Sequence, residues 1–119
     1  MRVGVNITSE QRSKALSVAL RILDKWQCSD REKATLLGLE HEWEDREEVS
    51  DYTLERISYI LNIHKALRKT FSSDETIYDW VRKPNTHPTL SGTPAIDFMK
   101  HRGNCGLSTV MNLAVDFSS

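Results

Sequence analysis

Hydrophobic side chains recur at steps of three and four residues between positions 54 and 71, which places them on one face of a helix. Polar residues such as Glu55 and Lys69 fall on the opposite side. Ser50 stands where an N-cap residue would, and Val49 is placed to pack on Leu54 as a hydrophobic staple. We therefore expect a helix from about residue 50 to residue 70. Its predicted apolar face is Leu54, Ile57, Leu61, His64, Leu67 and Phe71.

Two helices are predicted before this one. Thr8 and Gln11 have the spacing of a capping box, and so have Ser29 and Glu32, with Gly38 as the stop of the second helix. The first helix should end near residue 27. The side chains expected to face the core are Leu16, Leu20, Leu23, Trp26, Ala34, Leu36 and Leu37.

The C-terminal part predicts three more helices, separated by helix breakers. Ser72 and Glu75 have capping-box spacing for a helix over about 73–83. The prolines and glycine of 84–92 predict a loop, and a short helix should then run from about residue 93 to Gly103, followed by a last helix. The residues expected to face inward are Ile77, Trp80, Val81, Ile96, Phe98, Met99, Leu107, Val110, Met111, Ala114 and Val115. No segment has a strand pattern, so the predicted fold class is all-α.

The composition is that of an ordinary soluble globular chain, since 39% of its 119 residues are hydrophobic and 28% are charged. This length suits one compact core or two small lobes. The net charge of −1 lacks the basic footprint of a nonspecific nucleic-acid binder. No apolar run approaches the roughly 20 residues of a membrane span, and no signal peptide is recognisable, so we expect a cytoplasmic protein. Cys28 and Cys105 stand alone and fit reduced thiols.

Two closely spaced helices, the second short and ended by Gly38, are typical of the opening of a helix-turn-helix. A recognition helix with basic or amide side chains should come next. Residues 40–48 instead hold six acids against one arginine, a charge balance that DNA phosphates would repel. The residues left for weak DNA binding are Arg31, Lys33 and Arg46.

Motifs that identify enzymes are missing, because the sequence has no phosphate-binding glycine loop, nucleophile elbow or His-Glu-x-x-His pair. The four histidines lie in separate segments, so we predict neither a metal site nor a cofactor. His64 is expected at the edge of the core, bonded to a neighbouring carbonyl. Trp26 and Trp80 fit helical faces and should be core residues, whereas Trp43 is either a partner contact or a lid on the core.

The second half of the chain carries residues whose order and spacing match a known family. They are Arg56, Leu61, Ile63, His64, Ala66, Leu67, Phe71, Trp80, Pro84, Asn85, Leu90, Gly92, Pro94, Gly106, Leu107 and Val110. With them, residues 56–115 resemble the toxin-binding domain of the Xre/MbcA/ParS antitoxins, partners of RES-domain toxins in bacterial type II toxin–antitoxin modules. Residues 23–39 resemble in part the Xre-type helix-turn-helix of that family. The chain departs from the family in its acidic segment and at Ser91, where a second glycine is common.

The resemblance implies an antitoxin without catalysis of its own, which binds a RES-domain toxin and blocks the cleft that holds nicotinamide adenine dinucleotide. It divides the chain into a truncated, Xre-like helix-turn-helix and dimerisation part (1–50) packed on a helical toxin-binding domain (51–119). Homodimerisation is expected through the first helix with Val3–Ile7. The alternative is a helix-turn-helix transcription regulator of its own operon. The expected toxin-binding residues are Trp80, Arg82, Lys83, Pro84, Asn85, Leu90, Gly92, Pro94, Phe117, Ser118 and Ser119.

Overall fold

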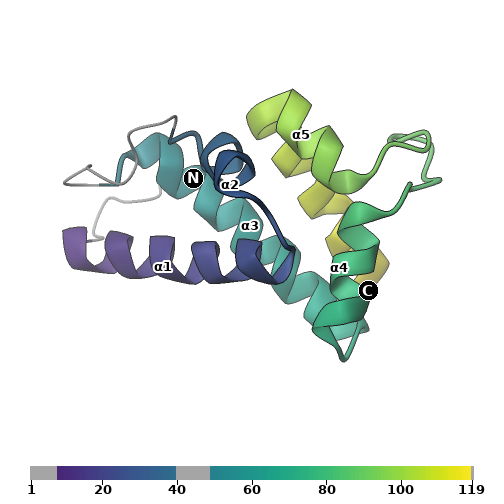
Figure 1. Cartoon of the computed structure of the whole chain (residues 1–119), viewed down its shortest axis with the longest axis horizontal. Coiled ribbons are helices and arrows are strands. Elements are labelled where there is room, and N and C mark those ends of the chain that lie inside the picture. The colour runs from purple at the N-terminus through teal and green to yellow at the C-terminus, as the bar shows by residue number, and fades with distance from the viewer. Residues whose placement is uncertain (1–7, 40–48, 119) are drawn as a thin grey trace.

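The computed structural model describes residues 8–39 and 49–118, and the regular elements in these ranges are all α-helices (Figure 1). They are α1 (Ser9–Lys25), α2 (Asp30–Leu37), α3 (Asp51–Thr70), α4 (Asp74–Arg82) and α5 (Ala95–Ser118). Within the same ranges the backbone forms no strand, although an isolated antiparallel bridge joins Pro84 to Pro94. The predicted all-α fold class is confirmed.

Side-chain caps set the beginnings of the first three helices where the sequence predicts them. The side-chain oxygens of Thr8 and Ser29 accept the backbone N–H groups of Gln11 and Glu32, respectively. In return, the side-chain oxygens of Gln11 and Glu32 accept the backbone N–H groups of Thr8 and Ser29, which completes two capping boxes. Ser50 accepts the Thr53 N–H at 3.1 Å and begins α3. Gly38 ends α2 in a left-handed conformation (φ 68°), as its position predicts.

The capping box predicted for Ser72 and Glu75 is wrong. Ser73 caps α4 instead, because its side chain accepts the Thr76 N–H at 3.2 Å and its backbone is extended (φ −125°, ψ 150°). The Ser73 and Thr76 hydroxyls also lie within hydrogen-bonding distance, at 2.9 Å. The cap therefore pairs two hydroxyls, whereas the predicted Ser72–Glu75 box would have paired a hydroxyl with a carboxylate. As a result α4 begins at Asp74.

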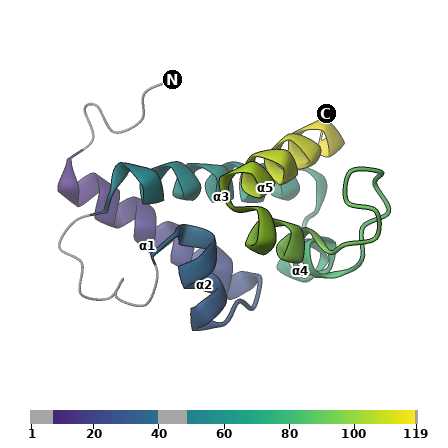
Figure 2. The same ribbon diagram turned by 90° about the horizontal axis from the view of Figure 1, so that it is seen from above.

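The central helix is α3, which packs against α1 on one side and against α5 on another (Figure 2). Its buried residues are Thr53, Leu54, Arg56, Ile57, Ile60, Ile63, Ala66 and Leu67. The predicted apolar face was therefore misplaced in part, since Leu61, His64 and Phe71 are only half-buried. A single stripe of apolar residues is the pattern of a helix with one buried side, whereas a helix with neighbours on two sides buries a wider arc.

Gly103 divides α5 into two arms, which the sequence predicts as two helices. Its backbone (φ 61°, ψ −137°) lies outside the helical region and in a part of φ/ψ space that glycine tolerates best. At this bend the two arms come very close together. A Cβ atom on Gly106 would lie 2.7 Å from the Phe98 carbonyl oxygen and 3.1 Å from the Met99 Cα.

One apolar cluster draws on each of the helices described above, with Leu23, Leu36, Ile60, Ile77 and Ile96 fully buried in it. The cluster crosses position 50, so the two predicted parts share a core. Their description as separate units, 1–50 and 51–119, stays a prediction.

The sequence overstates the burial of some side chains at the edge of this core. Trp26 is fully buried, as predicted, but Trp80 is only half-buried and Val115 is 44% exposed. Leu16, Leu20, Ala34 and Met111 are likewise half-buried. These side chains lie where an apolar helix face meets solvent, a position that periodicity alone does not distinguish from the centre of the face.

Over the two described ranges, no helix combines the length and the apolar character that a membrane crossing requires.

We predict that Gly106→Ala destabilises the protein by about 1–3 kcal/mol, because the new methyl group overlaps backbone atoms of the first arm of α5. Helix propensity alone predicts the opposite sign, a gain of roughly 0.5–1 kcal/mol. Urea unfolding measures the difference. Cys105→Ala is the control, since this exposed neighbour should change stability by less than about 0.5 kcal/mol. A more stable Gly106→Ala variant would contradict the close approach of the two arms.

Candidate functional site

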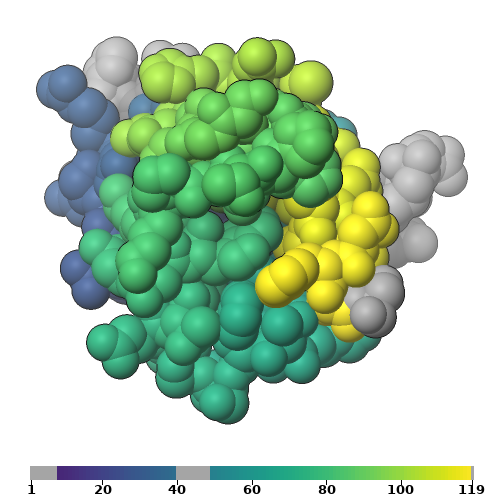
Figure 3. All heavy atoms as spheres, turned by 90° about the vertical axis from the view of Figure 1, so that its right-hand side faces the viewer, coloured from purple at the N-terminus to yellow at the C-terminus, as the bar shows by residue number. Residues whose placement is uncertain are grey.

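The end of α4, the loop after it and the last turn of α5 meet at one end of the molecule (Figure 3). The loop is held by its own hydrogen bonds. The Asn85 side-chain oxygen accepts the His87 N–H at 2.9 Å, and the Asn85 carbonyl accepts the Gly92 N–H at 2.7 Å. Leu90 is 2% exposed and anchors the loop in the core. This segment is thus fixed before any partner arrives, which lowers the entropy cost of binding.

Aromatic side chains cluster beside this loop. The Phe117 ring is 53% exposed, and its centroid lies 5.8 Å from that of Phe71 and 6.3 Å from that of Trp80. A hollow of about 420 Å³ is lined by Trp80, Asn85, Thr86, His87, Leu113, Asp116 and Phe117. A second, of about 360 Å³, shares Trp80, Asn85 and Thr86 with the first. Its other lining residues are Phe71, Thr76, Asp79, Lys83 and Pro84.

Five of the predicted toxin-binding residues therefore gather on one surface. We call this the Trp80–Phe117 surface and define it as Trp80, Lys83, Pro84, Asn85 and Phe117. Its centre is aromatic, and it carries Lys83 and Asn85, while the hollows beside it are also lined by the acids Asp79 and Asp116. An exposed aromatic centre with a polar rim is the usual composition of a protein-binding site.

The other candidates near this surface have different surroundings. Leu90 is buried, and Pro94 is half-buried at the base of the loop, where it pairs with Pro84. Gly92 is exposed with φ 89°. The Ser118 hydroxyl donates to the Val115 carbonyl at 2.9 Å. Ser119 lies outside the described residues.

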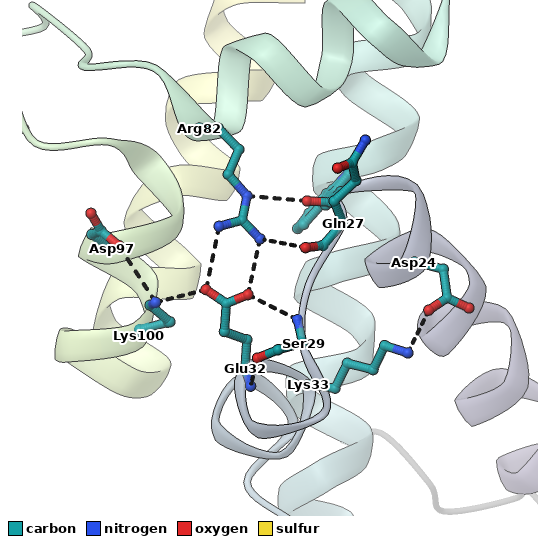
Figure 4. Close-up of polar contacts among 9 residues, drawn as sticks. Asp24, Gln27, Ser29, Glu32, Lys33, Arg82, Asp97 and Lys100 are labelled. Atoms are coloured by element: carbon teal, nitrogen blue, oxygen red, sulfur yellow. Dashed lines mark hydrogen bonds and ion pairs between the residues drawn. The ribbon is translucent and has the colours of Figure 1, made fainter.

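Arg82 points away from the surface and into the molecule (Figure 4). Its guanidinium donates to the carbonyls of Trp26 at 3.1 Å and Gln27 at 3.0 Å, both just beyond the end of α1. It also donates to both carboxylate oxygens of Glu32 on α2, at 3.0 and 3.3 Å. Lys100 of α5 reaches the same carboxylate at 2.8 Å. The expectation that Arg82 belongs to the binding surface is thus not what the structure shows, because its donors are used internally.

The surroundings of Glu32 stabilise its charged form. Hydrogen bonds from Arg82 and Lys100, together with the Ser29 backbone N–H, lower the pKa of Glu32 to about 2, although its burial acts in the opposite direction. The cluster of Glu32, Arg82 and Lys100, which we call the α2–α4–α5 tie, is largely removed from solvent. Burial raises the pKa of the neighbouring Cys28 thiol to about 11, which keeps this thiol protonated and unreactive.

The chain is 36% identical over 90 residues to y4oB, an uncharacterized protein of Sinorhizobium fredii (strain NBRC 101917 / NGR234), and the match covers 71% of the present chain and 68% of the relative. The chain belongs to the same family as y4oB. No family model and no solved structure matches the chain. The name of the relative states no activity, so the functional argument rests on the residues themselves.

The candidates for DNA binding are dispersed. Arg31 is exposed on α2, but Lys33 is 14% exposed and its ammonium pairs with Asp24. Arg46 lies outside the described residues, as do Trp43 and the acidic segment 40–48. The described part of α2 therefore offers one fully accessible cation to a phosphate backbone.

His64 lies at the edge of the core, as predicted, but within residues 8–39 and 49–118 the expected hydrogen bond to a carbonyl does not form. Its Nδ1 has no hydrogen-bond partner among the residues that the structure describes. Burial lowers the pKa of His64, and the charge of Arg68 adds to this effect. Over the same residues, His, Cys, Asp and Glu side chains form no group of three that would hold a metal ion.

Sequence reasoning missed residues of two kinds, those that line the larger hollow and one that belongs to the α2–α4–α5 tie. Thr86, His87, Leu113 and Asp116 line the larger hollow, and only their proximity to Asn85 and Phe117 along the chain could have suggested them. Lys100 has no sequence signal for its role, since its partner Glu32 is 68 residues away.

We predict that Glu32→Gln lowers the free energy of unfolding at neutral pH. The variant should also lose much of the decrease in this free energy that the wild type shows at acidic pH. The lowered pKa of Glu32 stabilises the folded state fully above pH 4.5, the usual value, and this contribution is lost as the pH falls from 4.5 to about 2. Its upper limit is about 3 kcal/mol, from the difference between the two pKa values.

Urea unfolding of the wild type and the variant at a series of pH values measures this effect. The difference in unfolding free energy between them should shrink steadily below pH 4.5. Glu75→Gln, which changes an exposed carboxylate in the first turn of α4, is the control and should give a nearly constant difference. A constant difference for Glu32→Gln as well would contradict the assigned role of the tie.

Proposed function

We propose that this protein is the antitoxin of a type II toxin–antitoxin module and has no catalysis of its own. It acts by binding a RES-domain toxin and covering the cleft in which the toxin holds nicotinamide adenine dinucleotide. The Trp80–Phe117 surface makes the contact. The observation that carries the proposal is an exposed aromatic surface set beside a loop that its own hydrogen bonds hold in place.

The positions that carry the family resemblance fall into two groups, and this division supports the proposal. Ile63, Leu67, Leu107 and Val110 are fully buried, so packing in the core accounts for them. Trp80, Pro84 and Asn85 instead border the hollows at the surface. Packing does not require an aromatic ring, a proline and an amide at such positions, whereas recognition of a partner does.

The shape and chemistry of the surface suit the covering of a nucleotide cleft. A rigid loop and a projecting ring enter a concave site with little loss of conformational freedom. Phe117 offers the largest exposed ring next to the loop, and a ring of this kind fills the space of a base or a nicotinamide. Lys83 and Asn85 supply a charge and hydrogen-bonding groups for the polar edge of that cleft.

We predict that removal of residues 117–119 abolishes neutralisation, and that Phe117→Ala weakens toxin binding by roughly ten- to a hundredfold, as for an aromatic hot spot. Co-expression with the adjacent open reading frame, followed by pull-down and a growth assay, provides the measurement. Lys65→Ala, which shortens an exposed side chain on α3, is the control and should leave both readouts unchanged. Full neutralisation by the shortened chain would show that this tail stays outside the cleft.

A transcription regulator is the second candidate, and the arrangement of α1 and α2 favours it. Lys25 ends the first helix and Asp30 begins the second, which is the short turn of a helix-turn-helix. The exposed cations it needs are few, because Lys33 already pairs with Asp24.

We predict weak binding to the chain's own promoter in a gel shift, with a shallow dependence on salt, because few phosphates would be neutralised. Arg31→Ala should reduce the shift, while Lys65→Ala on α3 serves as an exposed control. Tight binding with a steep salt dependence would instead favour the regulator over the antitoxin.

A further inference from the structure

The larger hollow of the Trp80–Phe117 surface has an uncompensated negative end. Asp116 lines it, is exposed, and forms no ion pair with any residue in the described ranges. It belongs to the last turn of α5, which has no basic side chain of its own. Because the C-terminal carbonyls of a helix carry partial negative charge, Asp116 and the helix end act together on whatever enters the hollow. Both favour a cation.

The aromatic rings beside Asp116 are open to such a cation. Elsewhere in the described chain, arginine side chains lie over aromatic rings: Arg56 over Tyr52 at 4.7 Å, and Arg102 over Phe98 at 4.9 Å, from the guanidinium carbon to the ring centroid. No arginine in the described residues lies over Trp80 or Phe117. Tryptophan is the ring that binds cations most strongly.

We infer that the hollow between Trp80 and Phe117 receives an arginine side chain of the partner protein. This inference rests on the proposed function, since it assigns the chemistry of the contact at the same surface. The guanidinium plane lies against the rings and donates hydrogen bonds to the Asp116 carboxylate. The Asn85 and Thr86 side chains border the remaining edge of the hollow.

The arrangement favours arginine over lysine for two reasons. A planar guanidinium stacks on a ring face and still presents donors at its edge, whereas an ammonium presents a compact, strongly hydrated charge. In addition, two donors of arginine match the two oxygens of one carboxylate, and such a pair fixes the orientation of the side chain. The hollow that would hold this side chain has a volume of about 420 Å³.

The test is an NMR titration of the whole protein with three blocked tripeptides: acetyl-Leu-Arg-Leu-amide, its lysine counterpart and its citrulline counterpart. Citrulline keeps the shape of arginine but is neutral. The signal of the Trp80 indole N–H, assigned with Trp80→Phe, reports binding. We expect at least threefold tighter binding of the arginine peptide than of the citrulline peptide, with lysine between them. Asp116→Asn should remove this preference, while Asp30→Asn, the same change on α2, should retain it.

Three outcomes would overturn the inference. One is equal binding of the arginine and citrulline peptides, and another is a preference that persists in Asp116→Asn. The third is a shift of the Trp80 signal on dilution of the protein alone, which would assign the hollow to a second copy of the chain.

The proposed function has a separate readout, so the two failures are distinguishable. Absence of the arginine preference, with Phe117→Ala still weakening pull-down of the toxin, rejects the inference alone. A retained arginine preference in a protein that neither binds nor neutralises its neighbour rejects the toxin as partner and leaves the cation site in place.

Discussion

Burial of α3 between α1 and α5 is the constraint on which the rest of the structure depends. It requires apolar side chains over a wide arc, and it also brings Arg56 into the interior, where only 7% of it is exposed. The guanidinium is accommodated because it donates to the carbonyls of Thr35 and Leu36 at the end of α2, at 3.1 and 3.2 Å, and to the Tyr52 hydroxyl. Arg56 thus donates to the Leu36 carbonyl at a helix end, where carbonyls lack the usual helical partner, and is a second donor to the Thr35 carbonyl, which also accepts the Gly38 N–H. Thus α3 holds α2 by a polar contact as well as by packing.

The α2–α4–α5 tie is a second polar contact that holds α2, because it joins this helix to α4 and α5. Glu32 caps its own helix through the Ser29 N–H and at the same time receives Arg82 and Lys100 from helices far along the chain. Charged pairs with low exposure contribute most when every donor and acceptor is matched, as they are here for the carboxylate. The tie also decides which cations remain for recognition. Arg82 and Lys100 serve the interior, whereas Lys83, the next residue after Arg82, has a 71% exposed side chain that pairs only with Asp79, one helical turn before it, at 3.5 Å among the described residues.

How much of this structure the sequence predicts depends on how far apart along the chain the interacting residues lie. Caps act over three residues, so Thr8, Ser29 and Gly38 could be identified from local spacing alone. The interruption of α5 at Gly103 could likewise be predicted from the local sequence. The wide buried arc of α3 could not be predicted, because it depends on two helices that approach from different sides. The role of Arg82 could not be predicted either, since a basic residue next to a proline loop has the same local sequence whether it faces a partner or a half-buried carboxylate 50 residues away.

The internal contacts of Arg82 show what the N-terminal part of the chain contributes to the structure. The helices α1 and α2 have a structural role besides any contact with DNA. The carbonyls of Trp26 and Gln27 and the carboxylate of Glu32 fix Arg82, the last residue of α4. The loop that forms the Trp80–Phe117 surface begins at the following residue. The first two helices therefore help to set the position from which this surface starts, whether or not they also contact DNA.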